Sequence, residues 1–215
     1  MIPATDPEAD YRALVRRGYD ACARVYHESR RAQAPIEIRG LLEPLEDGAA
    51  VLDVGCGAGV PIARSLAERH RVTGVDVSPE MVRLARRHVP SGDFRCADVM
   101  STTFEPSSFD AVVALYSIFH VPREAQPALF RRLHRWLRLG GYLLCTLSHH
   151  SEPGYTESDF HGVTMYWSNF GLGEYLGTLA DSGFVVLETS STACGRDVTG
   201  EGAIEDHPLV LAKRQ

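Results

Sequence analysis

The sequence lacks several features that would suit a membrane, a nucleic acid or an oxidising compartment. Of its 22 basic residues only Lys213 is a lysine, and no basic block interrupts a chain of formal net charge −6. Such a chain is a poor partner for a phosphate backbone, so we expect no nucleic-acid ligand. No apolar run reaches membrane-spanning length, and the polar, acidic start does not resemble a signal peptide. These absences predict a cytoplasmic protein with no membrane partner.

Cysteine is scarce and scattered. The five cysteines are odd in number and no two form a CxxC pair, which argues against a disulfide framework or a zinc knuckle. His149 and His150 precede His161 by about a dozen residues, but neighbours in an extended segment point to opposite faces and rarely bind one ion. We therefore predict reduced cysteines and no metal site.

The order of the expected elements is that of an α/β protein. Buried strand patterns and amphipathic helix patterns alternate over residues 49–148, and Ser78 is the expected N-cap of one helix. Two later strand patterns, separated by a loop without a helix, are expected to be antiparallel. We predict one Rossmann-like, doubly wound domain over 1–215, with a seven-stranded, mostly parallel sheet whose last strand is antiparallel. Strands are expected at 49–54, 71–77, 93–99, 109–117, 142–148, 184–191 and 209–214, and helices at 10–31, 61–69, 78–88 and 125–141.

Two segments lie outside this alternation. Residues 1–46, which include a long amphipathic helix, form an expected N-terminal helical cap. Residues 148–170 are dense in aromatic residues and histidine outside a regular strand, which is typical of a lid over a flat, apolar ligand. The alternative is that Tyr166 and Trp167 only pack a loop against the sheet.

The stretch VLDVGCGAGV, residues 51–60, is a buried strand that runs into a glycine-rich loop. Such a loop brings the backbone close to a nucleotide. The dinucleotide fingerprint GxGxxG does not fit, because its third glycine position holds Val60 in one register and Ile62 in the other. The pattern is instead D-x-G-x-G-x-G, beginning at Asp53.

Acidic residues follow at the ends of the next two expected strands. Asp76 ends the second strand, and Asp98 ends the third. The carboxyl ends of parallel strands share one edge of the sheet, where ligands bind. A carboxylate at the position of Asp76 can accept two hydroxyl hydrogen bonds from one ribose. Three acids in this order therefore predict a site for a nucleoside-containing cofactor.

DVGCGAG, GVDVSPEM and CADVM resemble motifs of class I S-adenosylmethionine (SAM)-dependent methyltransferases, and the resemblance extends over about residues 51–214. LRLGG departs from the usual L-x-P-G-G only in Leu139. YSIFHVPRE and MYWSNF are most similar to small bacterial methyltransferases of small molecules. The resemblance implies SAM as cofactor and S-adenosylhomocysteine (SAH) as product, with the sulfonium and ammonium end near Asp53. The implied cofactor residues are Asp53, Gly55, Cys56, Gly57, Gly59, Asp76, Val77, Asp98, Val99, Leu115 and Tyr116.

Methyl transfer from a sulfonium requires an acceptor held in line and, for a neutral hydroxyl or N–H, a base. His120 follows the fourth expected strand at the ligand edge, so it is the candidate catalytic base. The alternative is a structural histidine that caps the next helix. The expected acceptor pocket consists of Tyr11, Tyr19, His120, His149, Tyr166 and Trp167.

The leading interpretation is a SAM-dependent methyltransferase of the EC 2.1.1 type, a monomer or homodimer. It would transfer a methyl group to an O or N atom of a small aromatic or heterocyclic metabolite, as natural-product tailoring enzymes do. One alternative is a SAM-binding protein with a non-methylating or regulatory role. The other is an NAD-dependent oxidoreductase, against which the missing third glycine counts. The sequence leaves the identity of the acceptor open.

Overall fold

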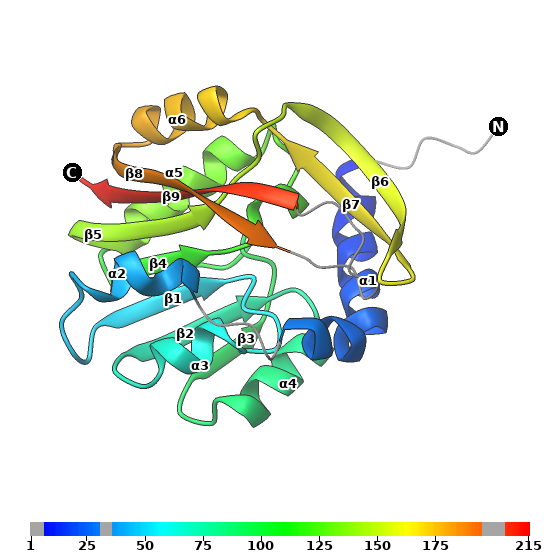
Figure 1. Cartoon of the computed structure of the whole chain (residues 1–215), viewed down its shortest axis with the longest axis horizontal. Coiled ribbons are helices and arrows are strands. Elements are labelled where there is room, and N and C mark those ends of the chain that lie inside the picture. The colour runs from blue at the N-terminus through cyan, green and yellow to red at the C-terminus, as the bar shows by residue number, and fades with distance from the viewer. Residues whose placement is uncertain (1–6, 31–35, 195–204) are drawn as a thin grey trace.

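The computed structural model describes residues 7–30, 36–194 and 205–215. A seven-stranded sheet with strand order β3-β2-β1-β4-β5-β9-β8 forms its centre (Figure 1). The first five strands are parallel, and β9 is antiparallel to both its neighbours, as the sequence predicted. The strands are β1 (Ala50–Val54), β2 (Arg71–Asp76), β3 (Asp93–Cys96), β4 (Phe109–Ala114), β5 (Leu137–Thr146), β8 (Phe184–Cys194) and β9 (Glu205–Arg214).

Helices cover both faces of the sheet, so each face has its own apolar core. In β4, Val112 belongs to the core beneath the two later helices, whereas its neighbour Val113 belongs to the core beneath the earlier ones. This alternation follows from the two-residue period of a strand. The helices are α1 (Pro7–Arg30), η1 (Ile36–Ile38), α2 (Arg39–Leu42), α3 (Ile62–Leu66), α4 (Pro79–His88), η2 (Ile118–His120), α5 (Gln126–Trp136) and α6 (Leu172–Asp181).

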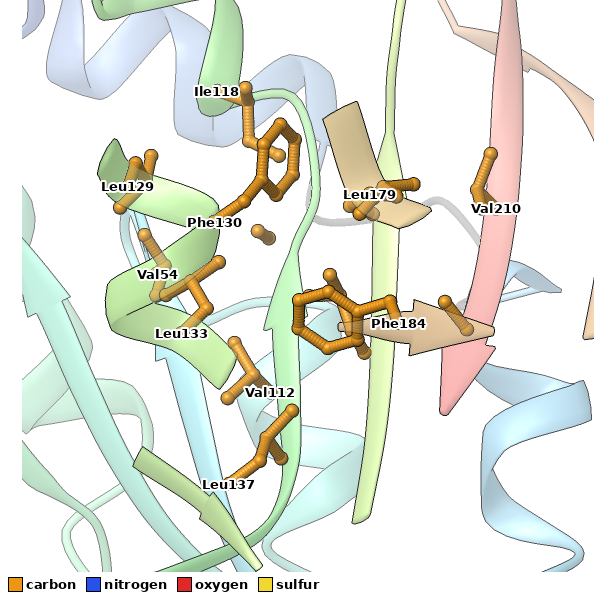
Figure 2. Packing of buried hydrophobic residues seen from close by; sticks show 14 of the residues in the cluster. Val54, Val112, Ile118, Leu129, Phe130, Leu133, Leu137, Leu179, Phe184 and Val210 are labelled. Atoms are coloured by element: carbon orange, nitrogen blue, oxygen red, sulfur yellow. The ribbon is translucent and has the colours of Figure 1, made fainter. Parts of the chain in front are cut away.

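The larger core joins the late part of the chain to the middle. Leu133 of α5, Leu179 of α6 and Phe184 of β8 pack with Val112 and Val210 of the sheet, all nearly inaccessible to solvent (Figure 2). Burying each such side chain contributes roughly 1.5–3 kcal/mol. The core therefore keeps β4 and β5 rigid beneath the loops at their carboxyl ends.

Two predictions of secondary structure are wrong between residues 125 and 183. The helix predicted to reach Gly141 ends at Trp136, and Leu137 begins β5. Leu137 has an extended backbone (φ −68°, ψ 149°) and pairs with Phe109 of β4, so strand pairing overrides the helical pattern. Helix α6 was not predicted at all, although it supplies Tyr175 and Leu179 to the core. Ser78 caps α4 as predicted, because its hydroxyl accepts the backbone N–H of Met81 at 3.1 Å.

The segment predicted as an irregular lid is a β-hairpin. Strands β6 (Glu152–Phe160) and β7 (Val163–Asn169) form a separate two-stranded sheet, with His161 and Gly162 in the left-handed conformation between them. Nearly all of β6 is exposed, so it lacks the alternation of apolar and polar residues that marks a half-buried strand. Pairing with β7 makes it a strand, which is why the sequence did not reveal it.

Helix α1 lies beside this hairpin at one edge of the molecule (Figure 1). The two elements approach closely at Gly18, where an added Cβ would lie 2.8 Å from the Met165 side chain. The predicted cap, 1–46, therefore packs on the predicted lid, 148–170, although its residues 1–6 and 31–35 lie outside the described ranges. None of the described helices is long and apolar enough to cross a membrane.

Candidate functional site

A cavity opens at the carboxyl edge of the sheet, where β1 lies between β2 and β4. The order of the strands reverses at this point, and open α/β sheets bind their ligands at such a switch point. We call this space the main cavity. Loops after β1 to β4 line one side, and α1 lines the other. Its walls include the predicted residues Gly55, Gly57, Asp76, Val77, Asp98, Val99, Leu115, Tyr116, Tyr11, Tyr19 and His120.

A second, smaller space, the side cavity, continues from the main cavity. The two share Tyr26, Gly55, Gly57, Leu115 and Tyr116 as lining residues. The side cavity adds the predicted residues Asp53 and Cys56, together with Arg30 of α1. The glycine loop therefore forms the boundary between the two spaces.

The glycines of the loop have different roles. Gly55, Gly57 and Gly59 all have positive φ angles of 71°, 50° and 76°, which other residues rarely adopt. An added Cβ on Gly57 would meet nothing within 4 Å, so it would project into open space at the cavity. An added Cβ on Gly59 would lie 3.1 Å from the Cα of Ala85, so Gly59 allows the loop to pack on α4. Gly59 itself lines neither cavity.

Asp76 is buried and anchored to the backbone. Its Oδ2 accepts the N–H of Gly57 at 2.9 Å, and its Oδ1 accepts the N–H of Ser78 at 2.8 Å. Burial raises the pKa of Asp76 to about 6, although these backbone hydrogen bonds act in the opposite direction. Because an ionised carboxylate has about four acceptor sites, Asp76 keeps capacity for two further donors.

Asp53 is more deeply buried than Asp76, and its hydrogen bonding is less complete. It is 3 % exposed, and its Oδ2 has no hydrogen-bond partner within the described parts of the chain. Burial and, secondarily, the nearby Asp76 raise the pKa of Asp53 to about 7. A buried carboxylate of this kind is stabilised by a cationic or hydrogen-bond-donating ligand.

Asp98 lies two residues beyond the end of β3, not at its last residue as predicted. Its Oδ1 accepts the N–H of Met100 at 2.8 Å, and its Oδ2 lies 2.9 Å from the Nε of Arg12. Asp98 still lines the main cavity, beside Val99. An Arg12 partner reached from α1 could not be foreseen, because the two residues are far apart in the sequence.

His120 and Tyr19 form a hydrogen-bonded pair between η2 and α1. The His120 Nδ1 lies 2.9 Å from the carbonyl oxygen of Tyr166, which can only accept, so Nδ1 carries the proton. The Nε2 lone pair therefore accepts the Tyr19 hydroxyl at 2.7 Å. Burial lowers the pKa of His120 to about 4 and raises the pKa of Tyr19 well above its usual value. His120 is thus neutral at physiological pH, and neither ring nitrogen caps a helix.

Aromatic rings from α1 and the hairpin surround this pair. The Trp167 ring centroid lies 4.5 Å from that of His120, and the Tyr166 ring lies 5.4 Å from that of Tyr11. Neither Tyr166 nor Trp167 lines the main cavity, so both support it from behind. His149 is also outside the lining. It is 41 % exposed, and its Nε2 lies 3.4 Å from Asp206 Oδ2.

Sequence reasoning missed five residues of the site on α1, namely Arg12, Val15, Tyr26, His27 and Arg30. Tyr26 follows Tyr19 by two helical turns and therefore shares its face, a spacing that could have identified it. The arginines resembled the solvated charges of any amphipathic helix. Only the packing of α1 across the sheet edge distinguishes them.

Cys56 is not a second reactive group of the site. Cys56, in the side cavity, is a free thiol whose pKa is raised well above its usual value by burial and by the nearby Asp76 and Asp53. It is therefore a protonated packing residue. Among residues 7–30, 36–194 and 205–215, no group of three or more His, Cys, Asp or Glu could hold a metal ion.

The sequence matches the family model of a methyltransferase domain over residues 51–141. It is 36% identical over 108 residues to phosphoethanolamine N-methyltransferase 3 of Arabidopsis thaliana, covering 47% of this chain and 21% of that protein. It is also 36% identical over 146 residues to the ubiquinone biosynthesis O-methyltransferase of Xanthomonas euvesicatoria pv. vesicatoria (strain 85-10), covering 64% of this chain and 59% of that protein. The chain thus matches less than two thirds of the length of either curated relative.

The fold is similar to that of solved methyltransferases. The 1,6-didemethyltoxoflavin-N1-methyltransferase of Burkholderia thailandensis has a TM-score of 0.73 at 21% identity, covering 100% of this chain and 93% of that one. The magnesium protoporphyrin IX methyltransferase of Synechocystis PCC 6803, with bound SAH, has a TM-score of 0.72 at 16% identity, covering 96% and 100%. These matches show a methyltransferase-domain sequence over residues 51–141 and, for the chain as a whole, the fold of solved methyltransferases.

Proposed function

We propose that the protein transfers the methyl group of SAM to an O or N atom of a small aromatic or heterocyclic molecule. The observation that carries the proposal is the Tyr19–His120 pair, which lies in an aromatic-walled cavity directly beside the glycine loop. Flat apolar acceptors suit such walls, because aromatic rings stack on them and exclude water.

The residues of the two cavities fit SAM. The open space at Gly57 accommodates a ligand where a side chain would intrude, and Asp76 has acceptor sites for the two ribose hydroxyls. The unpartnered oxygen of Asp53 suits the ammonium group of the amino-acid end. Asp98 and Val99 line the part of the main cavity assigned to the adenine. When bound, SAM supplies an electrophilic methyl group on a good leaving group.

Proton removal from the acceptor is assigned to the Tyr19–His120 pair. The Tyr19 hydroxyl donates to His120 Nε2, so its oxygen lone pairs can accept a proton from an acceptor O–H or N–H. The new bond to carbon makes the acceptor O–H or N–H acidic, so the Tyr19 oxygen takes that proton as the bond forms, while the Tyr19 proton moves to Nε2 in spite of the lowered pKa of His120. The resulting imidazolium is held through Nδ1–H by the Tyr166 carbonyl and later returns its proton to solvent. Such a positioned base typically contributes about 10²–10⁴-fold in rate.

The named relatives support an O or N acceptor without selecting one. One is a phosphoethanolamine N-methyltransferase, one is an O-methyltransferase of ubiquinone biosynthesis, and one solved neighbour is an N-methyltransferase of 1,6-didemethyltoxoflavin. The last of these covers nearly the whole of both chains, and its substrate name is that of a heterocycle.

The test is SAH formation from SAM with a panel of phenols, catechols, nitrogen heterocycles and, as a non-aromatic comparison, phosphoethanolamine. We expect turnover with at least one aromatic or heterocyclic compound and none with the Gly57→Val variant. Turnover with phosphoethanolamine alone would contradict the proposed acceptor class. SAM binding without SAH formation across the panel would favour the SAM-binding, non-methylating alternative.

A further inference from the structure

Asp20 on α1 makes hydrogen bonds to the start of a second helix. Its Oδ1 accepts the hydroxyl of Ser78, the N-cap of α4, at 2.6 Å and the backbone N–H of Glu80 at 3.3 Å. The positive end of the α4 dipole favours a carboxylate at this place. The two helices also meet through apolar groups, because Ala23 of α1 and Met81 of α4 belong to one buried cluster. Asp20 therefore fixes one side of α1 to α4.

Ser78 connects this contact to the acid assigned to the ribose. Its backbone N–H donates to Asp76 Oδ1 at 2.8 Å, while its hydroxyl donates to Asp20 and accepts the N–H of Met81. Ser78 is fully buried, so water does not compete for these hydrogen bonds. The same residue thus holds both α1 and the Asp76 carboxylate.

The place of Asp20 is not one that stability alone would favour. Aspartate in a helix interior is less favourable than alanine, by up to about 0.7 kcal/mol. Burial is the main cause of the raised pKa of Asp76, and the charge of Asp20 adds to it, so the two carboxylates repel each other. Because both effects oppose folding, a role in the site accounts for Asp20 better than a purely stabilising one.

Tyr19 is the residue before Asp20, so the two side chains leave α1 about 100° apart. Tyr19 reaches His120 at 2.7 Å, whereas Asp20 reaches the start of α4. The hydroxyl of a tyrosine lies far from the helix axis, so a small rotation of α1 displaces it strongly. A misplacement of about 1 Å at a reacting group can cost about 10²-fold in rate. The contact of Asp20 with α4 therefore controls where the Tyr19 hydroxyl lies.

We propose that Asp20 is a positioning residue that fixes the rotation of α1 and thereby the place of the Tyr19 hydroxyl in the main cavity. This inference rests on the proposed function, because it takes Tyr19 as the group that accepts the proton. Asp20 itself lines neither cavity, so it acts only through its neighbour. Through Ser78, the helix that carries the acceptor base and the loop that carries Asp76 are held in one fixed arrangement.

The test is a double-mutant cycle on the turnover of a phenol or N–H heterocycle that is neutral at the assay pH. Asp20→Ala should lower turnover about ten- to a hundred-fold in the wild-type background and less than about two-fold in Tyr19→Phe. Calorimetric titration should show SAH affinity nearly unchanged. Asp20→Asn keeps an oxygen acceptor for the Ser78 hydroxyl and should retain most of the turnover.

Two control variants on α1 separate this contact from the other charges of the helix. Glu28→Ala also removes an acid, at an exposed position, and should keep full turnover. Arg16→Met removes the exposed Arg16–Asp20 ion pair, whose atoms lie 3.9 Å apart, and should keep full turnover as well.

Losses that simply add in the double-mutant cycle would overturn the proposal, because they would indicate a general structural effect. Unchanged turnover in Asp20→Ala would overturn it too, as would a loss of SAH affinity as large as the loss of turnover. If Asp20→Ala does not fold, Asp20→Ser, whose side chain is too short for the contact, decides in the same cycle. Wild-type turnover in Tyr19→Phe would instead refute the proton path of the proposed function, and this proposal with it.

Discussion

At the scale of single residues, the hydrogen bond between Tyr19 and His120 makes the Tyr19 hydroxyl the group that would face the acceptor in the proposed reaction. His120 cannot reach it directly, because its Nε2 is occupied by the Tyr19 hydroxyl and its Nδ1 by the Tyr166 carbonyl. For a neutral acceptor, Tyr19→Phe should therefore lower turnover by about 10²–10⁴-fold and leave SAH affinity unchanged. Tyr155→Phe, on the exposed strand β6, is the control and should retain full turnover. Wild-type turnover in Tyr19→Phe would exclude the proton path.

The lowered pKa of His120 predicts the pH profile of the same step. With a pKa of about 4, the imidazole is in its basic form from pH 5 upward. At saturating SAM, where the ionisation of Asp53 and Asp76 does not limit cofactor binding, the turnover should therefore be flat through pH 6.5, where an ordinary histidine titrates, and should fall only as the pH approaches 4. Steady-state rates between pH 4.5 and 8 measure this. An inflection near 6.5 that disappears in His120→Gln would contradict it.

The ionisation of Asp53 makes the free energy of unfolding depend on pH. Its pKa in the folded, ligand-free protein, about 7, is above the unfolded value near 3.8, so its contribution is lost as the pH rises through 7. Asp53→Asn removes this loss and should raise the free energy of unfolding at pH 8 by about 1–4 kcal/mol, with a smaller gain at pH 5. Because burial lowers the pKa of His120, this residue lowers the free energy of unfolding as the pH falls below 6.5. The effect is the same in the wild type and in Asp53→Asn. Urea denaturation measures the difference, and an equal gain at both pH values would refute the assignment.

At the scale of elements, the contact with the β6–β7 hairpin holds α1, which lines the main cavity, at the edge of the sheet. A side chain at Gly18 would meet both the Met165 side chain and, at 3.2 Å, the backbone oxygen of Thr164. Gly18→Val should therefore separate the elements, destabilise the protein by about 1–3 kcal/mol and raise the acceptor KM.

A matched control for Gly18→Val is available in α6. An added Cβ at Gly177 meets nothing within 4 Å, so Gly177→Ala should stabilise the protein by about 0.5–1 kcal/mol without changing KM. Denaturation and steady-state kinetics of both variants provide the comparison. An unchanged KM in Gly18→Val would show that the hairpin contact does not shape the acceptor site.

At the scale of the whole molecule, cofactor binding should stabilise the fold, because the two cavities join α1 to the loops of four strands. SAH at 100 times its Kd adds about 2.7 kcal/mol, which is roughly 5–10 °C in Tm for a chain of this size. NAD should cause no shift. Gly57→Val should abolish the SAH shift, because its side chain projects into the cavity, and should also lower the ligand-free Tm, because a β-branched residue is strained at a φ of 50°. A shift with NAD and none with SAH would favour the oxidoreductase alternative.

The sequence by itself determined the sheet, the glycine loop and the acids behind it. These features depend on local pattern: buried strands are continuous apolar runs, and parallel strands bring their carboxyl ends to one edge. Asp53, Gly57 and Asp76 could therefore be placed without a structure. The missed helix α6 and the wrong end of α5 show the limit, because Leu137 is a strand residue only through its pairing with β4.

The tertiary structure alone decided how the site is closed. Tyr19 and His120 are 101 residues apart, and Arg30 reaches the side cavity only because α1 crosses the edge of the sheet. Burial then determines the protonation states: His120 stays neutral and Asp53 loses most of its acidity, since desolvation penalises the charged form of each. Local patterns carry no information about burial by segments distant in the chain, so the chemistry of these side chains depends on the folded arrangement.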